Sequence, residues 1–473
     1  MIELHEFGEL AAPQTPAALA PVLRGEVAPG AERTLAIASY GTLVVLGIFA
    51  AAVATVSDSA RTLHTTVAGT TWVLSGMSLG LAIALLTAGA LADDFGRRRM
   101  LLAGAALLTA TSALGALSPS TGVLVAARIL QGVGGAGVLA ASLGSVGHAF
   151  PAGPRRTQAT AVWAAAVGGG IALGPVVAGA LTAWSGWRSS FWLEAIASAI
   201  LVVAALALPE SRSHVARGID LPGTASLAAA MGLITGGLVE GRSSWSSAST
   251  VGLLAGGVAM LAIFALIELR RSEPMLDLRL FRDRRFVASI TGALFTGVAV
   301  IGLMSFSLSA MQLGLHISVL GSAGILTAWS ATSMAVALGA RWLPARLSSP
   351  TRLAIGLALC AVGEVALTGI DGGSSWARLL PGLVIAGVGS GVANAALGRL
   401  AVESVPRERA GVGSGANNTA RYLGGAAGVA LVVAISTGAG GTDLVHGWSV
   451  AAGVSAGLCA IGVAIALACR PRS

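Results

Sequence analysis

Ionisable side chains are rare inside the apolar stretches of this sequence, so those that occur there are the first candidates for chemistry. Arg128, Glu194 and Glu364 lie several residues inside apolar runs, whereas Glu240 and Glu268 stand at the ends of theirs. A carboxylate among apolar side chains favours its neutral form, so it can bind and release a proton near neutral pH. An arginine in such a run needs a polar interior or a partner. These residue types indicate proton binding and release.

The sequence leaves open which carboxylate binds the proton. Glu194 lies a few residues from one end of its run, and Glu364 lies near the middle of its own. Either can instead be a structural acid, paired with an arginine or a backbone donor. We favour Glu364 slightly, with Arg128 as the cation that competes with the proton for the carboxylate. Arg128 itself can alternatively be a structural cation that holds helices together.

A second charged set lies in a short segment between two apolar runs. Residues 89–99 read Gly-Ala-Leu-Ala-Asp-Asp-Phe-Gly-Arg-Arg-Arg, and the residues of interest are Gly89, Asp93, Gly96, Arg97 and Arg98. Gly96 gives the backbone the freedom that a sharp turn needs. Asp93 falls at the C-terminal end of a predicted helix, where the helix dipole disfavours an anion. We therefore expect it to contact a cationic side chain or the N-terminus of another helix.

Two further motifs follow along the chain. Gln131 comes three residues after Arg128, which places both side chains on one face of a helix. In the next apolar run, Gly170 and Gly174 have the spacing of a close contact between membrane helices. Pro175 removes a backbone hydrogen bond and should bend this helix, and Gly179 follows it.

The elements that must position these residues are fourteen apolar runs of about 20 residues, which is the length of a membrane-spanning helix. They lie near 34–56, 67–92, 100–117, 121–147, 157–184, 190–209, 222–240, 249–268, 287–311, 318–343, 352–370, 377–402, 412–437 and 447–469. The predicted fold class is an all-α polytopic membrane protein.

Arginine supplies all 29 basic residues, and its distribution predicts the orientation. Most arginines fall in segments on the side of the N-terminus, and only four lie in loops on the other side: Arg61, Arg188, Arg242 and Arg378. Positively charged loops stay in the cytoplasm. We therefore expect a multi-pass protein of the plasma membrane with both termini cytoplasmic.

An internal repeat indicates the domain organisation. Residues 131–135 read Gln-Gly-Val-Gly-Gly, and residues 386–390 read Ala-Gly-Val-Gly-Ser. Arg128 has no counterpart, because Leu383 occupies its place. The repeat predicts two six-helix bundles related by an axis along the membrane normal, with two helices inserted between them. The expected divisions are a cytoplasmic tail at 1–33, the N-terminal bundle at 34–209, the inserted pair with its linkers at 210–285 and the C-terminal bundle at 286–473.

Together these motifs resemble signatures of the major facilitator superfamily. Residues 89–99 resemble its loop between helices 2 and 3, residues 128–132 its R-x-x-Q-G motif in helix 4, and residues 170–179, which read Gly-Ile-Ala-Leu-Gly-Pro-Val-Val-Ala-Gly, its Gly-rich antiporter motif in helix 5. With fourteen spans, the whole chain resembles the drug:proton antiporter branch. The resemblance implies alternating access between two bundles, gating by the 89–99 segment and proton coupling at Arg128.

The sequence departs from this branch in two places. The branch usually carries an Asp in the middle of its first helix, where Val45 stands here, and an Asn where Glu194 stands. Either the proton-binding site has moved to another acid, or the coupling differs.

Composition excludes several classes. The chain is 55% hydrophobic and only 11% charged, against about 25% charged in soluble proteins. Its three cysteines, Cys360, Cys459 and Cys469, lie in apolar runs and imply no disulfide framework. The six histidines lack metal-ligand spacing, and without lysine there is no phosphate-binding Gly-Lys motif. We expect no enzyme activity, no metal, no cofactor and no direct use of ATP.

The predicted function is proton-driven efflux of small toxic or amphipathic molecules by alternating access. The expected partners are a small-molecule substrate, protons and the lipid bilayer, with the chain acting as a monomer and binding no nucleic acid. One alternative is an exporter dedicated to a single endogenous metabolite or antibiotic. The other is a multispan membrane protein that does not transport.

Overall fold

The computed structural model describes residues 30–151, 153–212, 220–241, 244–272, 274, 276–339, 347–406, 409–438 and 443–470. The described chain contains 14 helices that are long and apolar enough to cross a membrane, which confirms the predicted number of spans. The predicted N-terminal tail lies outside the described residues except for its last four positions.

Six helices form the N-terminal bundle: α2 (Ala31–Thr62), α3 (Val67–Phe95), α4 (Arg97–Ala116), α5 (Thr121–Ala149), α6 (Pro154–Ser185) and α7 (Trp187–Ala205). The inserted pair is α8 (Leu221–Gly241) and α9 (Ala248–Arg270). The C-terminal bundle begins after the short η1 (Leu278–Arg282) with one span built from α10 (Arg284–Phe295), η2 (Thr296–Ile301) and α11 (Gly302–Leu313). It continues with α12 (Val319–Gly339), α13 (Ser349–Ala366), η4 (Trp376–Arg378), α14 (Leu379–Glu403), α15 (Ala410–Gly438) and α16 (Leu444–Ala468).

Several helices begin where a side chain satisfies the free backbone N–H groups of the first turn. Thr66, Ser120, Ser247 and Ser348 each accept a hydrogen bond from the backbone N–H three residues later, at the starts of α3, α5, α9 and α13. Such caps stabilise a helix by about 1 kcal/mol. They fix where each span starts, and therefore which residues share its faces.

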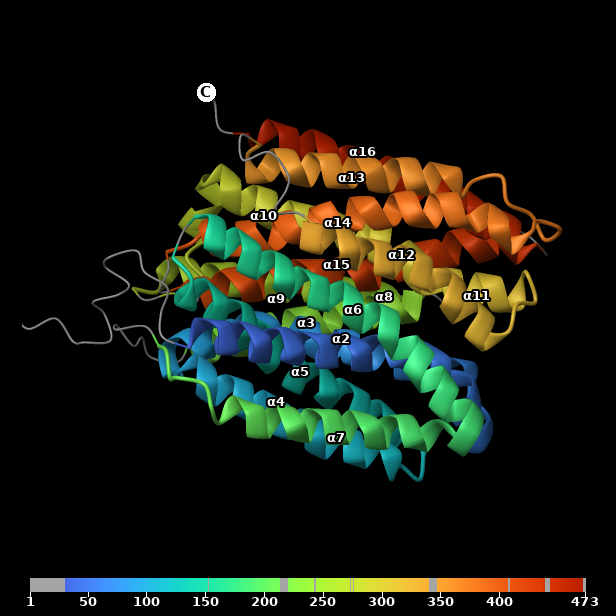
Figure 1. The fold of residues 1–473 in the computed structure, drawn as a ribbon, viewed down its shortest axis with the longest axis horizontal. Coiled ribbons are helices and arrows are strands. Elements are labelled where there is room, and N and C mark those ends of the chain that lie inside the picture. The colour runs from blue at the N-terminus through green and yellow to red at the C-terminus, as the bar shows by residue number, and fades with distance from the viewer. Residues whose placement is uncertain are drawn as a thin grey trace, which may run out of the picture.

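The helices run side by side, with the N-terminal bundle on one side of Figure 1 and the C-terminal bundle on the other. The start of α2 and the end of α16 lie at the same end of the molecule, called here the termini end. The bundles meet through contacts of α3 and α5 with α15, and of α6 with α12 and α14. The inserted α8 packs against both α3 and α15, whereas α9 packs on α8. Most of α9 is exposed, as expected of a helix that faces lipid.

Glycines bring the helix backbones close together in the same way in both bundles. A Cβ added at Gly104 of α4 would lie 2.6 Å from the backbone oxygen of Gly134 in α5. A Cβ added at Gly356 of α13 would lie 2.8 Å from the backbone oxygen of Gly389 in α14. Small residues permit such contacts between membrane helices. The repeated Gly-rich motifs of α5 and α14 are therefore packing elements.

The first span of the C-terminal bundle contains a π-helical turn, η2, between α10 and α11. A Cβ at Gly297 or Gly302 would collide with the backbone of α15, at Gly425 and Gly428. The turn therefore lies where this span crosses α15 most closely.

Candidate functional site

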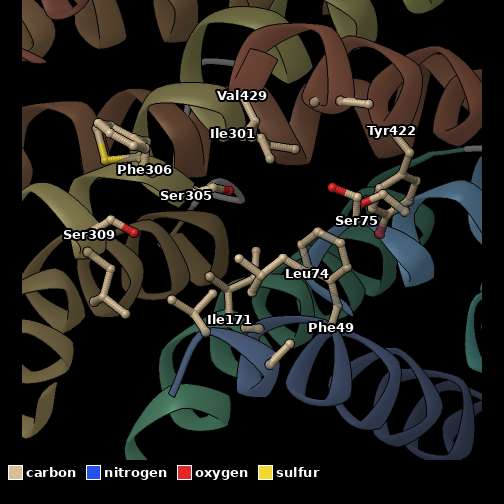
Figure 2. A pocket seen from close by; sticks show the side chains of 18 of the residues that line it. Phe49, Leu74, Ser75, Ile171, Ile301, Ser305, Phe306, Ser309, Tyr422 and Val429 are labelled. Carbon is tan, nitrogen blue, oxygen red and sulfur yellow. The ribbon is translucent and has the colours of Figure 1, made fainter. Parts of the chain in front are cut away.

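A cavity of about 400 Å³ lies between the two bundles, in the half of the molecule away from the termini end. Figure 2 shows Phe49 of α2 and Ile171 of α6 on one wall, and Ile301, Phe306 and Val429 of the C-terminal bundle on the other. Cavities of this size hold drug-sized molecules. The inserted pair also reaches it, through Val239 and Glu240 at the last turn of α8.

Aliphatic side chains make up most of the lining, and aromatic rings and hydroxyl groups lie among them. The rings are those of Phe49, Trp72, Phe306, Trp329 and Tyr422, and the hydroxyl groups are those of Ser75, Ser78, Ser305 and Ser309. The rings of Phe49 and Tyr422 meet edge to face with centroids 5.7 Å apart, so they join the two bundles across the cavity. Glu240 and Arg421 are the acidic and basic side chains among the described residues that line the cavity. Such a surface suits an amphipathic molecule.

Beside the cavity, Arg128, Gln131 and Glu194 form one buried hydrogen-bonded network. Arg128 of α5 donates from Nη1 to Gln131 Oε1 over 2.9 Å. Gln131 Nε2 donates to Glu194 Oε2 of α7 over 3.1 Å and to Ser112 Oγ of α4 over 2.9 Å. Arg128 and Gln131 are fully buried and Glu194 is 8% exposed. The structure therefore brings three of the predicted coupling residues together, with the amide of Gln131 as the bridge.

The same network reaches the cavity wall through the backbone of α2. Arg128 Nη1 donates to the carbonyl oxygen of Ile48 over 3.1 Å, and Nη2 donates to that of Phe49 over 3.5 Å. Phe49 lines the cavity and contacts Tyr422 of the other bundle. Arg128 is thus hydrogen-bonded to the backbone of a residue that touches both the cavity and the opposite bundle.

Glu364 lies apart from these residues, between α13, α14 and α16, and its side chain is fully buried. The thiol of Cys459 faces its carboxyl group, and Cys360 lies one turn earlier on α13. Among the described residues, neither carboxyl oxygen accepts a hydrogen bond from a nitrogen or hydroxyl donor. Cys360 also lies 3.6 Å from Ser390 Oγ, which accepts a 3.0 Å hydrogen bond from Trp329 of the cavity wall.

Asp93 lies at the termini end and contacts both kinds of partner that we expected for it, a cationic side chain and the N-terminus of another helix. Its Oδ1 accepts a 2.6 Å bond from Arg97 Nη2 in a pair that is buried on both sides. Its two oxygens also accept 3.1 and 3.0 Å bonds from the backbone N–H groups of Gly411 and Val412, in the first turn of α15. The positive end of α15 thus binds an anion of the other bundle. A side chain at Gly89 would collide with Gly411, so α3 and α15 need this glycine.

The rest of the 89–99 segment is held by Glu210, which follows α7 and which sequence reasoning missed. Gly96 has a φ of 120°, and a side chain there would collide with the Glu210 carboxylate. Glu210 accepts a 3.2 Å bond from the backbone N–H of Arg98 and lies 3.6 Å from Arg99 Nε. The only available signal was that Glu210 is an isolated acid next to a span that ends on the arginine-rich side.

The glycines of α6 lie against α2. Side chains at Gly170 and Gly174 would meet the backbone of α2 around Gly47. Gly179 lies more openly, with its nearest neighbour Ala54 at 3.8 Å from an added Cβ. α6 continues through Pro175, which lines the cavity.

Two charged residues that line the cavity, Glu240 and Arg421, were not recognised from the sequence as candidate site residues. Glu240 stands at the end of an apolar run, and Arg421 lies among small residues.

Comparison with known proteins gives one family. Residues 34–429 match the family model of the Major Facilitator Superfamily. The chain is 33% identical over 368 residues to the multidrug resistance protein Stp of Mycobacterium tuberculosis, covering 77% of this chain and 68% of that protein. It is 32% identical to the puromycin resistance protein pur8 of Streptomyces alboniger, over 84% of this chain and 80% of that one. It is also 32% identical to the multidrug efflux pump LfrA of Mycolicibacterium smegmatis, over 77% and 73% of the two chains.

Solved structures agree on the fold. The human organic anion transporter MFSD10 (TETRAN) superposes with a TM-score of 0.68 at 17% identity, covering 93% of this chain and 100% of that one. The proton:xylose symporter XylE superposes with a TM-score of 0.66 at 15% identity, covering 92% and 95% of the two chains.

Proposed function

Since this chain belongs to the major facilitator superfamily and is related to drug efflux pumps, we propose that it exports small toxic or amphipathic molecules in exchange for protons. The observation that carries this proposal is the cavity between the bundles, with its aromatic and hydroxyl lining beside a buried carboxylate network. The proposed domains are the N-terminal bundle at residues 34–209, the inserted unit at residues 210–285 and the C-terminal bundle at residues 286–473.

In this proposal the termini end faces the cytoplasm, as the arginine distribution favours. The contact of Asp93 with the start of α15 closes that side, and the cavity lies in the outer half. The structure then represents an outward-facing state of the transporter. Breaking the Asp93 contact would allow the bundles to open towards the cytoplasm and load the next substrate.

Glu194 is our choice for the proton-binding group, with Glu364 as the alternative. Its support is the connection from Glu194 through Gln131 and Arg128 to the backbone of Phe49. When Glu194 is ionised, its charge balances that of Arg128. When Glu194 binds a proton, this balance is lost. The positive charge of Arg128 is then stabilised more strongly by its hydrogen bonds to the carbonyl oxygens of α2. The cavity wall at Phe49 then responds to protonation without direct contact between proton and substrate.

The test uses inside-out vesicles with an imposed pH gradient and a panel of dyes and drugs. Wild type should accumulate part of the panel and release protons when substrate is added. Glu194→Gln should abolish substrate-induced proton release, while exchange of substrate without a gradient continues, because the cavity is intact. Glu364→Gln serves as the matched control, since it removes another buried carboxylate.

Several results would contradict parts of the proposal. Normal proton release in Glu194→Gln would exclude Glu194 as the coupling group, and loss of release only in Glu364→Gln would assign that role to Glu364. If vesicles with the wild-type protein transport no compound under any gradient, the proposed export function is wrong. Accumulation of a single compound from a broad panel would instead establish a dedicated exporter.

A further inference from the structure

The inserted helix α8 is positioned to take part in substrate binding. It packs against α3 and α15, which belong to different bundles. An apolar cluster that includes Ala82 and Leu86 of α3 and Leu227 and Met231 of α8 fixes its register. The last turn of α8 consequently reaches the cavity, where Val239 and Glu240 form part of the wall. α9 supports this arrangement from outside, with Leu254 packed against Gly237.

We propose that Glu240 determines specificity, because its carboxylate binds the positively charged amine of a substrate in the cavity. This inference rests on the proposed export function and deepens it. It also gives the inserted pair a direct role, since Glu240 is the one acid among the described residues that line the cavity.

The two charges of the cavity differ in their availability. Arg421 is only 4% exposed, donates a 3.3 Å hydrogen bond to Asn394 Oδ1 and lies over the ring of Tyr422 at 5.8 Å. The guanidinium group of Arg421 is thus buried and already has a hydrogen-bond partner. Glu240 is half-buried and forms no hydrogen bond or ion pair with the residues that the structure describes. A ligand entering the cavity meets an available carboxylate and a shielded guanidinium, so positive charge is favoured over negative.

The neighbouring aromatic rings suit the same class of ligand. Trp72 of α3 and Trp329 of α12 line the cavity together with Glu240. An organic cation is attracted to the faces of such rings, and its apolar portion buries their surface. A neutral analogue of the same shape keeps the apolar contacts but leaves the carboxylate without a partner. Discrimination should therefore depend on Glu240 and not on the rings.

Binding to the purified protein tests this inference. The probes are N-dansylethylenediamine, whose free amine is cationic, and N-dansylethanolamine, its neutral counterpart of nearly the same size. Affinity is measured from dansyl fluorescence on the full-length protein in detergent. Wild type should bind the amine about tenfold more tightly than the alcohol, as expected for one charged hydrogen bond. Glu240→Gln should remove this preference and leave the affinity for the alcohol unchanged.

Asp58→Asn is the matched control, because Asp58 is an acid at the same end of the molecule that pairs with Arg61 outside the cavity lining. It should leave both affinities unchanged, which separates binding at the site from general attraction by surface charge. Unchanged binding of the alcohol shows that Glu240→Gln is folded, and Glu240→Asp should keep part of the preference.

The inference is overturned if wild type shows no preference for the amine, if Glu240→Gln keeps that preference, or if it weakens both probes equally. These measurements need no proton gradient. Failure of coupling in vesicles would therefore leave a Glu240-dependent preference intact, and the two proposals can fail separately.

Discussion

The two bundles share their packing but differ in what they bury. Gly104 against Gly134 and Gly356 against Gly389 are equivalent backbone contacts, one in each bundle. On the same helices, α5 carries Arg128 and Gln131 where α14 carries Leu383 and Ala386. One scaffold thus accommodates a charged network in the N-terminal bundle and an apolar interior at the matching place in the C-terminal bundle.

The buried acids follow this division. Glu194 reaches an arginine through an amide, whereas Glu364 faces the thiols of two cysteines. A buried carboxylate without a cation or good donors is costly to ionise, so Glu364 should stay neutral in this state. The comparison teaches that burial of an acid inside a span is not enough to identify a coupling site, because its neighbours determine whether it can change charge.

The largest effect on transport is expected at Asp93, where the N-terminal bundle contacts the C-terminal bundle. Asp93→Asn removes the ion pair with Arg97 and weakens the attraction to the first turn of α15. A contact that holds one conformational state contributes about 1–3 kcal/mol, so the transport rate should fall by about 5- to 150-fold. Transport in vesicles is measured against the amount of inserted protein.

Glu403→Gln provides the corresponding change in the C-terminal bundle. Glu403 pairs with Arg399 one turn earlier on α14, and both side chains are partly exposed. Such pairs contribute at most about 1 kcal/mol, so transport should stay close to that of wild type. Equal losses in the two variants would show that the Asp93 contact has no special role in holding the bundles together.

A medium loss of stability, equal in the two bundles, is expected when the glycines at their equivalent backbone contacts are replaced by alanine. Gly104→Ala and Gly356→Ala each force a Cβ against a neighbouring backbone, which should lower the free energy of unfolding by about 1–3 kcal/mol. Thermal unfolding in detergent measures both. Gly122→Ala and Gly457→Ala are controls, since nothing lies within 4 Å of a Cβ at either position. Strongly unequal losses would break the equivalence of the bundles.

The smallest effect is expected for Glu364→Gln. Because the neutral amide replaces a carboxyl group that we expect to be neutral, transport should stay within about twofold of wild type, a change of less than ~0.5 kcal/mol in the barrier. The initial rate of drug uptake measures this. A rate near that of an inactive variant would show that Glu364 changes charge during the cycle, and that both bundles carry coupling acids.

The sequence was sufficient for the features that depend on local composition. Runs of apolar residues predicted the number of spans, and the dipole argument predicted the kinds of partner for Asp93. It could not predict that Gln131 bridges Arg128 and Glu194, because this contact joins α5 and α7 and depends on how the helices rotate against each other. The position of Glu240 at the cavity was missed for the same reason: an acid at the end of a span looks interfacial until the neighbours of α8 are known.

The π-helical turn at Thr296–Ile301 sets the angular phase of the span that follows it. Each residue of an α-helix advances about 100° around the axis, and a π-helical turn accommodates an additional residue per hydrogen-bonded ring. Met304, Ser305, Leu308 and Ser309 face the cavity in this phase. If the turn tightened to α-helical geometry, the same residues would rotate away and others of α11 would replace them. The chemistry of this wall is therefore a property of backbone winding as well as of side-chain identity.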